Sequence, residues 1–155
     1  MTPLIELFVP GVPQQAGSKT AYPYKKKNGK MGVRVSDANP KAAHWKKVVA
    51  EAVIEYADKN EILSEPLDCP LSLTLKFTMP RPAGHYTKKK GGALTLKPKA
   101  PYWHTSKPDT TKLVRCVEDA LNGIVWDDDS SVCVQTASKE YGDKFGVLIH
   151  VEVIP

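Results

Sequence analysis

The sequence predicts an α+β domain in which a mixed or antiparallel sheet packs with two main helices. Three observations support this fold class. Apolar and polar residues alternate from Leu71 to Met79, which is the period of a half-buried strand. Residues 39–57 and 109–121 repeat their apolar positions at helical spacing. Further apolar runs of strand length stand near both ends of the chain, and two helices against such strands make an α+β domain.

The first half of the chain predicts a strand, a long basic connection and a helix. Residues 4–9 form the strand, which a Pro-Gly-Val-Pro turn ends. Residues 14–34 are polar, basic and glycine-containing, so we expect a long loop or a loose hairpin. An Asn-Pro pair at 39–40 supplies a capping side chain and a first-turn proline, and the helix that follows stops near Asn60.

The second half predicts a long connection, a helix and two closing strands. Residues 81–107 are rich in proline, glycine and lysine and show little core-forming periodicity, which indicates a functional or mobile connection. Asp109 then stands at the N-cap or first turn of a helix that ends at an Asn-Gly pair. Residues 124–126 return the chain to the core before the strands at 132–141 and 147–154.

The composition predicts one domain spanning residues 1–155, with 41% hydrophobic residues to form its core. The three cysteines form no CxxC pair, which predicts free thiols in a reducing compartment, with Cys116 and Cys133 in the core. Trp45 and Trp126 are predicted core residues. No apolar run approaches the roughly 20 residues of a membrane helix, and no secretory signal is recognisable. We expect a cytoplasmic protein without membrane contact.

The formal net charge of +5 is unevenly distributed along the chain. Two basic loops, at about residues 11–35 and 81–107, contain no acidic residue, whereas carboxylates concentrate between Asp109 and Asp143. Solubility alone would explain such charges. The more specific interpretation is that the basic loops bind a polyanion and that the carboxylates hold a divalent cation.

The carboxylates of the acidic segment lie at both ends of the predicted helix. Asp109 precedes this helix, and residues 127–129 are three consecutive aspartates that follow the return to the core. The return of the chain can bring the two groups together. Neighbouring carboxylates are costly unless a hard cation such as Mg²⁺ or Mn²⁺ lies between them. The alternative is an ordinary N-cap aspartate and a solvated turn.

Residues 107–132, KPDTTKLVRCVEDALNGIVWDDDSSV, closely resemble the central motif of the RusA family of Holliday-junction resolvases, many of them encoded by phages and prophages. That motif is roughly Lys-Pro-Asp-x-Asp-Asn/Lys-Leu-x-Lys/Arg, then Asp-Ala-Leu-x-Gly, then an aromatic residue, Asp-Asp and a valine. The segments PGVPQQAGSKTAY and VSDANPKAAHWKKVVAEA resemble the amino-terminal half of actinobacterial and phage members. The motif positions that this chain matches are Lys107, Pro108, Asp109, Leu113, Arg115, Asp119, Ala120, Leu121, Gly123, Trp126, Asp128, Asp129 and Val132.

The resemblance implies a homodimeric endonuclease that resolves four-way DNA junctions by paired nicks, in DNA recombination and repair. Its cofactor would be Mg²⁺, with Mn²⁺ as an alternative. The implied metal ligands are Asp109 and Asp129 with Asp128 beside them, and Arg115 would stand close to the scissile phosphate. The implied catalytic residues are Asp109, Asp129 and Arg115. Lysines of the basic segments would follow the phosphates of the junction arms without reading bases: Lys19, Lys25, Lys26, Lys27, Lys88, Lys89, Lys90, Lys107 and Lys112.

One departure from the motif affects the expected metal site. The second aspartate of the family's Asp-x-Asp is Thr111 here, so the site loses one charge. Three outcomes are open: Asp127 or Asp119 supplies a carboxylate, Thr111 holds a metal-bound water, or the protein binds junctions and cuts them poorly. The last is the alternative function. An RNA-binding accessory protein would explain the basic segments but leaves the spacing of the aspartates unexplained.

Other residues near the motif have simpler expected roles. Asp119 lies four residues after Arg115, so an ion pair within the helix is expected, with proximity to a metal as the alternative. Glu118 is expected in solvent and Asp127 in a solvated turn. His104 is expected in a surface loop, with a phosphate contact as the alternative. Tyrosines interleaved with the lysines are candidates for stacking on exposed bases: Tyr22, Tyr24, Tyr86 and Tyr102.

Overall fold

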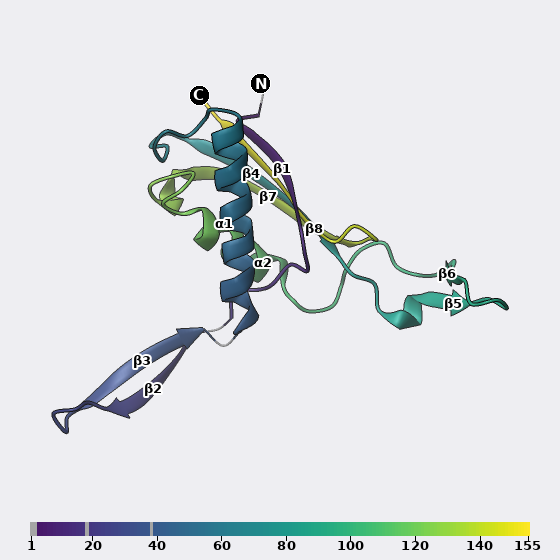
Figure 1. Ribbon diagram of the computed structural model, residues 1–155, viewed down its shortest axis with the longest axis horizontal. Coiled ribbons are helices and arrows are strands. Elements are labelled where there is room, and N and C mark those ends of the chain that lie inside the picture. The colour runs from purple at the N-terminus through teal and green to yellow at the C-terminus, as the bar shows by residue number, and fades with distance from the viewer. Residues whose placement is uncertain (1–2, 18, 38) are drawn as a thin grey trace.

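The computed structural model describes residues 3–17, 19–37 and 39–155, without the side chains of residues 19–22 and 33–37. In this part of the chain a four-stranded sheet forms the body of the molecule (Figure 1). The strand order is β1 (Ile5–Pro10), β8 (Gly146–Val153), β4 (Leu71–Met79) and β7 (Val132–Tyr141). β8 pairs antiparallel with both β1 and β4, whereas β4 and β7 are parallel. The predicted fold class is confirmed, and the sheet is mixed.

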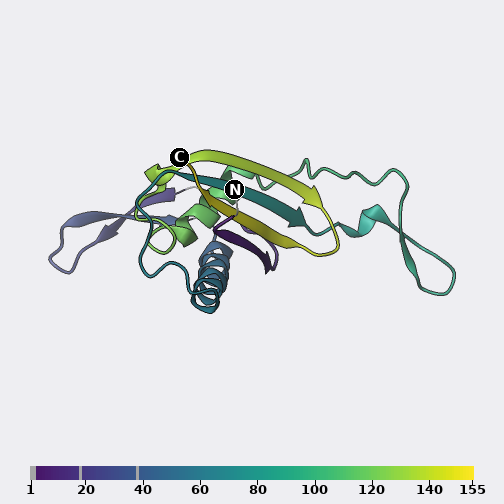
Figure 2. The ribbon, with the colours of Figure 1, turned by 90° about the horizontal axis from the view of Figure 1, so that it is seen from above.

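Both helices, α1 (Lys41–Lys59) and α2 (Thr110–Leu121), cover one face of this sheet (Figure 2). The strict alternation of β4 follows from that arrangement, because its apolar residues are buried beneath the helices and Lys76 is exposed on the other face. Burial of apolar area between helices and sheet is the main source of stability. The helix residues buried in this core are Ala42, Trp45, Val49, Val53, Ala57, Leu113, Val114, Cys116, Val117, Ala120 and Leu121.

The start of α1 is fixed by local hydrogen bonds. The side-chain oxygen of Asn39 accepts from the Lys41 N–H at 3.2 Å, and its amide donates to the Gln15 carbonyl at 2.9 Å. Gly11 approaches the Trp45 ring so closely that a Cβ there would lie 2.7 Å from the ring, at a backbone φ of +135°. The Asn-Pro signal therefore marks the helix start correctly, and the preceding turn packs directly on α1.

Two hairpins project from the body on opposite sides (Figure 1). The first pairs β2 (Lys19–Lys25) with β3 (Met31–Asp37), which is the loose hairpin that the sequence left as one alternative. The second pairs β5 (Tyr86–Lys88) with β6 (Leu94–Leu96), inside the segment predicted as a connection without core-forming periodicity. This hairpin has no periodic signal because neither face packs on a core, and its leucines are exposed.

Burial of the thiols and indoles follows the predictions except at Cys133. Cys116, Trp45 and Trp126 are buried, as expected, whereas Cys133 is exposed. The register of β7 explains this exception, because Val132 pairs with Leu71 and Val134 with Ser72, leaving Cys133 as the extra residue of a β-bulge. Among the described residues, no helix combines the length and hydropathy needed to cross a bilayer.

Candidate nuclease site

A polar cleft of about 270 Å³ lies between α2 and the edge strand β7. Residues from both elements line it: Thr110, Thr111, Val114, Arg115, Glu118, Gln135 and Ala137. On α2, Thr111, Arg115 and Glu118 share one face because steps of four and then three residues return nearly to the same direction. The buried apolar residues of α2 hold the helix against the sheet, so this polar stripe remains open toward β7.

The β-bulge at Cys133 determines which side of β7 faces the cleft. After the bulge, Gln135 pairs with Leu73 and Ala137 with Leu75, two strand residues buried beneath the helices. Val134 is thereby turned to the open face of the sheet, where 47% of its surface is exposed. Without the extra residue, Val134 would point toward α2 instead. The bulge therefore places a polar amide in the cleft, as bulges near functional sites often do.

At one end of the cleft, Asp109 occupies the N-cap position of α2, as predicted. Its carbonyl accepts from the N–H groups of Lys112 and Leu113 at 3.1 Å, but its side chain makes no capping hydrogen bond and is exposed. The preceding chain is held by Lys139 of β7, whose Nζ donates to the carbonyls of Ser106 and Pro108 at 2.6 and 2.7 Å. The Asp109 carboxylate is thus free for a ligand, on backbone that is anchored to the sheet.

At the other end, the aspartate cluster stands where β7 begins. Trp126 Nε1 donates to Asp129 Oδ1 at 2.8 Å, which fixes this half-buried carboxylate and leaves its second oxygen available. The Asp128 carboxylate accepts from the Ser130 N–H at 2.9 Å, and this hydrogen bond lowers the pKa of Asp128. Asp127 is exposed, which confirms its prediction as a solvated turn residue.

Glu118 does not lie in solvent, contrary to the prediction. It is half-buried in the cleft, whose lining also includes Gln135 of β7. Burial raises the pKa of Glu118, the Gln135 side chain opposes this, and the negative charges of Asp129 and Asp119 raise the pKa further. The residue pattern could not indicate this, because it does not reveal the bulge that brings Gln135 opposite Glu118.

Asp119 forms its ion pair with another helix than predicted. Its Oδ2 lies 3.4 Å from the Nζ of Lys46 on α1, and no ion pair with Arg115 occurs in the described part of the chain. The cause is the packing of α1 beside α2, which brings Lys46 to this side chain. Such a partly exposed pair contributes little stability, but it leaves Arg115 exposed on the face that lines the cleft.

His104 is buried rather than exposed in a surface loop. Its ring lies 4.7 Å from that of Tyr141, and burial together with the charge of Lys139 lowers its pKa. The reason is that the preceding segment adds to the end of β7, with Tyr141 N–H donating to the Tyr102 carbonyl at 2.9 Å. This hydrogen bond holds the chain that leaves the second hairpin against the end of β7, just before the carbonyls that Lys139 binds.

The tyrosines proposed for base stacking differ in their surroundings. The hydroxyl of Tyr86 donates to Asp143 at 3.4 Å, and that of Tyr102 donates to Glu140. Tyr102 is 56% exposed, so its ring remains accessible. Tyr24 is half-buried, and the side chain of Tyr22 lies outside the described residues. Stacking on bases stays a prediction for these residues.

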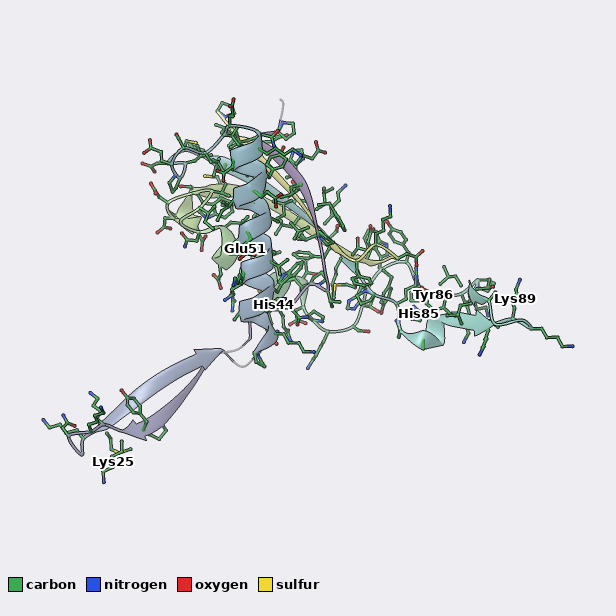
Figure 3. All side chains as sticks on the ribbon, in the orientation of Figure 1. Lys25, His44, Glu51, His85, Tyr86 and Lys89 are labelled. Carbon is green, nitrogen blue, oxygen red and sulfur yellow. The ribbon has the colours of Figure 1, made fainter. Side chains whose placement is uncertain are left out.

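The predicted phosphate-binding lysines gather mainly at the tips of the two hairpins. Figure 3 labels Lys25 on the first hairpin and Lys89 on the second, at the two far ends of the molecule. Lys107 is exposed and Lys112 half-buried, both beside Asp109, whereas the Lys19 side chain lies outside the described residues. The other predicted lysines of the hairpins are also exposed: Lys26, Lys27, Lys88 and Lys90.

A hard divalent cation fits the donors of this cleft, although not as a cage of protein ligands. Among the described residues, no three His, Cys, Asp or Glu side chains come together as a set that could hold a metal ion. Mg²⁺, however, is usually bound by one or two carboxylates and completes its shell with water and substrate phosphates. Glu118 in the wall of the cleft is one carboxylate of this kind. The convergence of Asp109 with Asp128 and Asp129 stays a prediction.

Comparison with known proteins shows the family to which this chain belongs. Residues 14–152 match the model of the family described as Endodeoxyribonuclease RusA. A curated relative, uncharacterized protein YqaN of Bacillus subtilis (strain 168), is 31% identical over 123 residues, covering 76% of this chain and 76% of YqaN. The chain belongs to the RusA family, which confirms the resemblance seen in its central motif.

Proposed function

We propose that this protein is a structure-selective, divalent-metal-dependent endonuclease that resolves four-way DNA junctions by paired nicks, in DNA recombination and repair. The observation that carries the proposal is the α2–β7 cleft, in a chain that matches the RusA family over residues 14–152. The cleft combines an exposed arginine with carboxylates near both of its ends. That is the donor set needed to bind a phosphodiester beside a cation.

The proposed catalytic residues are Asp109, Asp129 and Arg115. Asp109, Asp128 and Asp129 would hold Mg²⁺ or Mn²⁺, which when bound activates water and neutralises charge on the phosphate. Arg115, exposed in the middle of the lining, is suited to bind the scissile phosphate and to stabilise the negative charge that develops there.

Basic hairpins on opposite sides of the body support a DNA substrate with more than one arm. The exposed lysines at both tips would neutralise backbone phosphates on different arms of the junction (Figure 3). Lys107 and Lys112 would hold the strand near Asp109. Because lysine contacts to phosphate carry no sequence information, these contacts position the DNA without reading its bases.

Paired nicks require two cutting sites, and each chain offers one cleft. We therefore propose a homodimer with two-fold symmetry, in which the two clefts face opposite strands of one junction. Sedimentation of the free protein and of its junction complex measures this assembly directly.

A second candidate function is junction binding with weak or absent cleavage. Thr111, which is exposed and lines the cleft, places a neutral hydroxyl where the family motif has an aspartate. The described residues also bring no three potential metal ligands together. Both observations favour a binder over an enzyme if no other carboxylate compensates.

A cleavage assay on an end-labelled synthetic four-way junction distinguishes these functions. The assay is run with Mg²⁺, with Mn²⁺ and with chelator, beside a linear duplex of the same sequence. We expect metal-dependent, symmetrically placed nicks on the junction and none on the duplex. Tight junction binding without nicks in either metal would establish the binder, and equal cutting of both substrates would contradict structure selectivity.

A further inference from the structure

An exposed pair of aromatic side chains stands on the segment that joins the second hairpin to Asp109. Tyr102 is 56% exposed and Trp103 is 57% exposed, and their rings meet edge to face with centroids 4.8 Å apart. The other two tryptophans of the chain are buried in the core. Neighbouring large apolar side chains that stay in water indicate a binding surface.

The backbone that carries this pair is fixed to the rest of the protein. The Arg81 guanidinium donates to the Pro101 carbonyl at 2.8 Å. The Tyr102 carbonyl accepts from the Tyr141 N–H at 2.9 Å, and Trp103 forms an antiparallel bridge with β7. A ligand that binds here therefore meets rings on ordered backbone, which reduces the entropy that binding costs.

Tyr102 is itself held in place, and its ring supports the indole of Trp103. The Tyr102 hydroxyl donates to the carboxylate of Glu140, the residue that bridges to Trp103. Edge-to-face contact is a favoured arrangement of two aromatic rings. It leaves more than half of the Trp103 surface in solvent. Tyr102 thus orients the indole without covering it.

The charge of the segment around the pair fits a nucleic acid. Residues 97–107 contain three exposed lysines and no acidic residue: Lys97, Lys99 and Lys107. Proteins that bind unpaired strands combine such cations, which neutralise phosphates, with aromatic rings that stack on bases of any sequence. The aromatic pair and the lysines together have this composition.

The pair also lies within reach of the α2–β7 cleft. Trp103 precedes Asp109 by six residues, and Lys139 holds the carbonyls of Ser106 and Pro108 between them. Six residues span at most about 20 Å even when fully extended. That is the length of about six base pairs of a duplex arm. One DNA strand can therefore contact Trp103 and the cleft together.

We propose that Trp103, supported by Tyr102, stacks on a base that is exposed at the branch point of the DNA junction. Bases inside a duplex are covered on both faces by their neighbours, whereas a branch point interrupts the stack. The contact therefore favours branched over linear DNA. This inference rests on the proposed function and assigns its structure selectivity to a surface outside the cleft.

The fluorescence of Trp103 reports this contact without any cleavage, because stacking on a base quenches indole emission and the other tryptophans are buried. A synthetic four-way junction, or a linear duplex of the same arm sequences, is titrated into the protein in chelator. The anisotropy of labelled copies of both DNAs gives the affinities. The variants are Trp103→Ala, Trp103→Phe and Tyr102→Leu. The matched control is Phe8→Leu, at an exposed ring on the opposite edge of the sheet.

We expect saturating junction to quench the emission of the wild-type protein and saturating duplex to leave it nearly unchanged. Trp103→Ala should weaken junction binding about tenfold and leave duplex binding unchanged. Trp103→Phe should retain part of the junction affinity, because phenylalanine still offers a ring. Tyr102→Leu should reduce the quenching as well as the junction affinity, and Phe8→Leu should match the wild-type protein.

Equal quenching by junction and duplex would overturn the inference, as would an unchanged ratio of junction to duplex affinity in Trp103→Ala. A third contrary result is a change of assembly. If sedimentation shows that Trp103→Ala separates two copies of the chain, the aromatic pair is a contact between proteins and does not stack on bases.

The junction cleavage assay separates this inference from the proposed function. If the wild-type protein cuts junctions and Trp103→Ala still prefers junction to duplex as strongly, the function stands and the role of Trp103 is wrong. If the junction quenches Trp103 but the wild-type protein cuts nothing in either metal, the stacking contact stands and the nuclease proposal is wrong.

Discussion

At the scale of single residues, the environment of a side chain decides its role more than its type does. Glu118 and Asp119 are adjacent acids on the same helix, yet one enters the cleft and the other pairs with α1. A helix turns by about 100° per residue, so neighbouring side chains meet different elements. The sequence could not assign these partners, because α1 and β7 are distant in the chain and their packing is a property of the fold.

Lys139 is a residue for which the structure predicts a positioning role. Its ammonium group holds the carbonyls of Ser106 and Pro108, and so orients the chain that leads into Asp109. We expect Lys139→Met to slow single-turnover junction cleavage by about tenfold to a hundredfold, because small displacements of catalytic groups are costly. Junction affinity, measured by gel shift, should change much less.

The matched control for this prediction is Lys144→Met, which removes an exposed lysine from the turn between β7 and β8. A loss of affinity as large as the loss of rate would show that Lys139 binds DNA directly and does not position Asp109.

At the scale of elements, the strands and helices of the body were predictable and the hairpins only partly so. Strand 71–79 and the start of α1 agree with the prediction because alternation and capping are local properties. The hairpin β5–β6 was missed because its exposed leucines have no core to alternate against. The bulge in β7 was also invisible, since it depends on the register with β4.

The hairpin β2–β3 is predicted to bind DNA phosphates and to contribute nothing to chemistry. Replacing Lys25, Lys26 and Lys27 together by alanine should weaken junction binding and reduce its dependence on salt concentration. The slope of log affinity against log salt should fall by about 0.9 for each phosphate that the variant no longer neutralises. Fluorescence anisotropy with a labelled junction at several salt concentrations measures the slope.

In the same experiment, Lys59→Ala at the end of α1 should leave the slope unchanged, since this lysine lies away from both hairpins. An unaltered slope in the triple variant would contradict DNA binding at this hairpin, whatever happens to cleavage.

At the scale of the whole molecule, the basic and acidic segments of the sequence lie in different parts of the structure. The two basic hairpins project in opposite directions (Figure 1), and the acidic residues that could hold a cation line or flank the α2–β7 cleft in the body. The sequence predicted this separation from charge alone. It could not predict the strand order, in which β4 lies between the two strands that close the chain, because pairing partners are set by the global fold.

We propose that the carboxylates at the α2–β7 cleft hold the metal ion that cleavage requires, and that the basic surfaces bind the DNA. Asp129→Asn tests this most directly, because asparagine can still accept the Trp126 hydrogen bond while losing the charge needed for a metal. The measurement compares single-turnover cleavage in Mg²⁺ with junction affinity in chelator, using Asp58→Asn on exposed α1 as the control.

We predict that Asp129→Asn cuts at least about a hundredfold more slowly and binds the junction as tightly as the wild-type protein. The control variant should match the wild-type protein in both properties. Wild-type cutting by Asp129→Asn, or a parallel loss of affinity and rate, would contradict this division of roles.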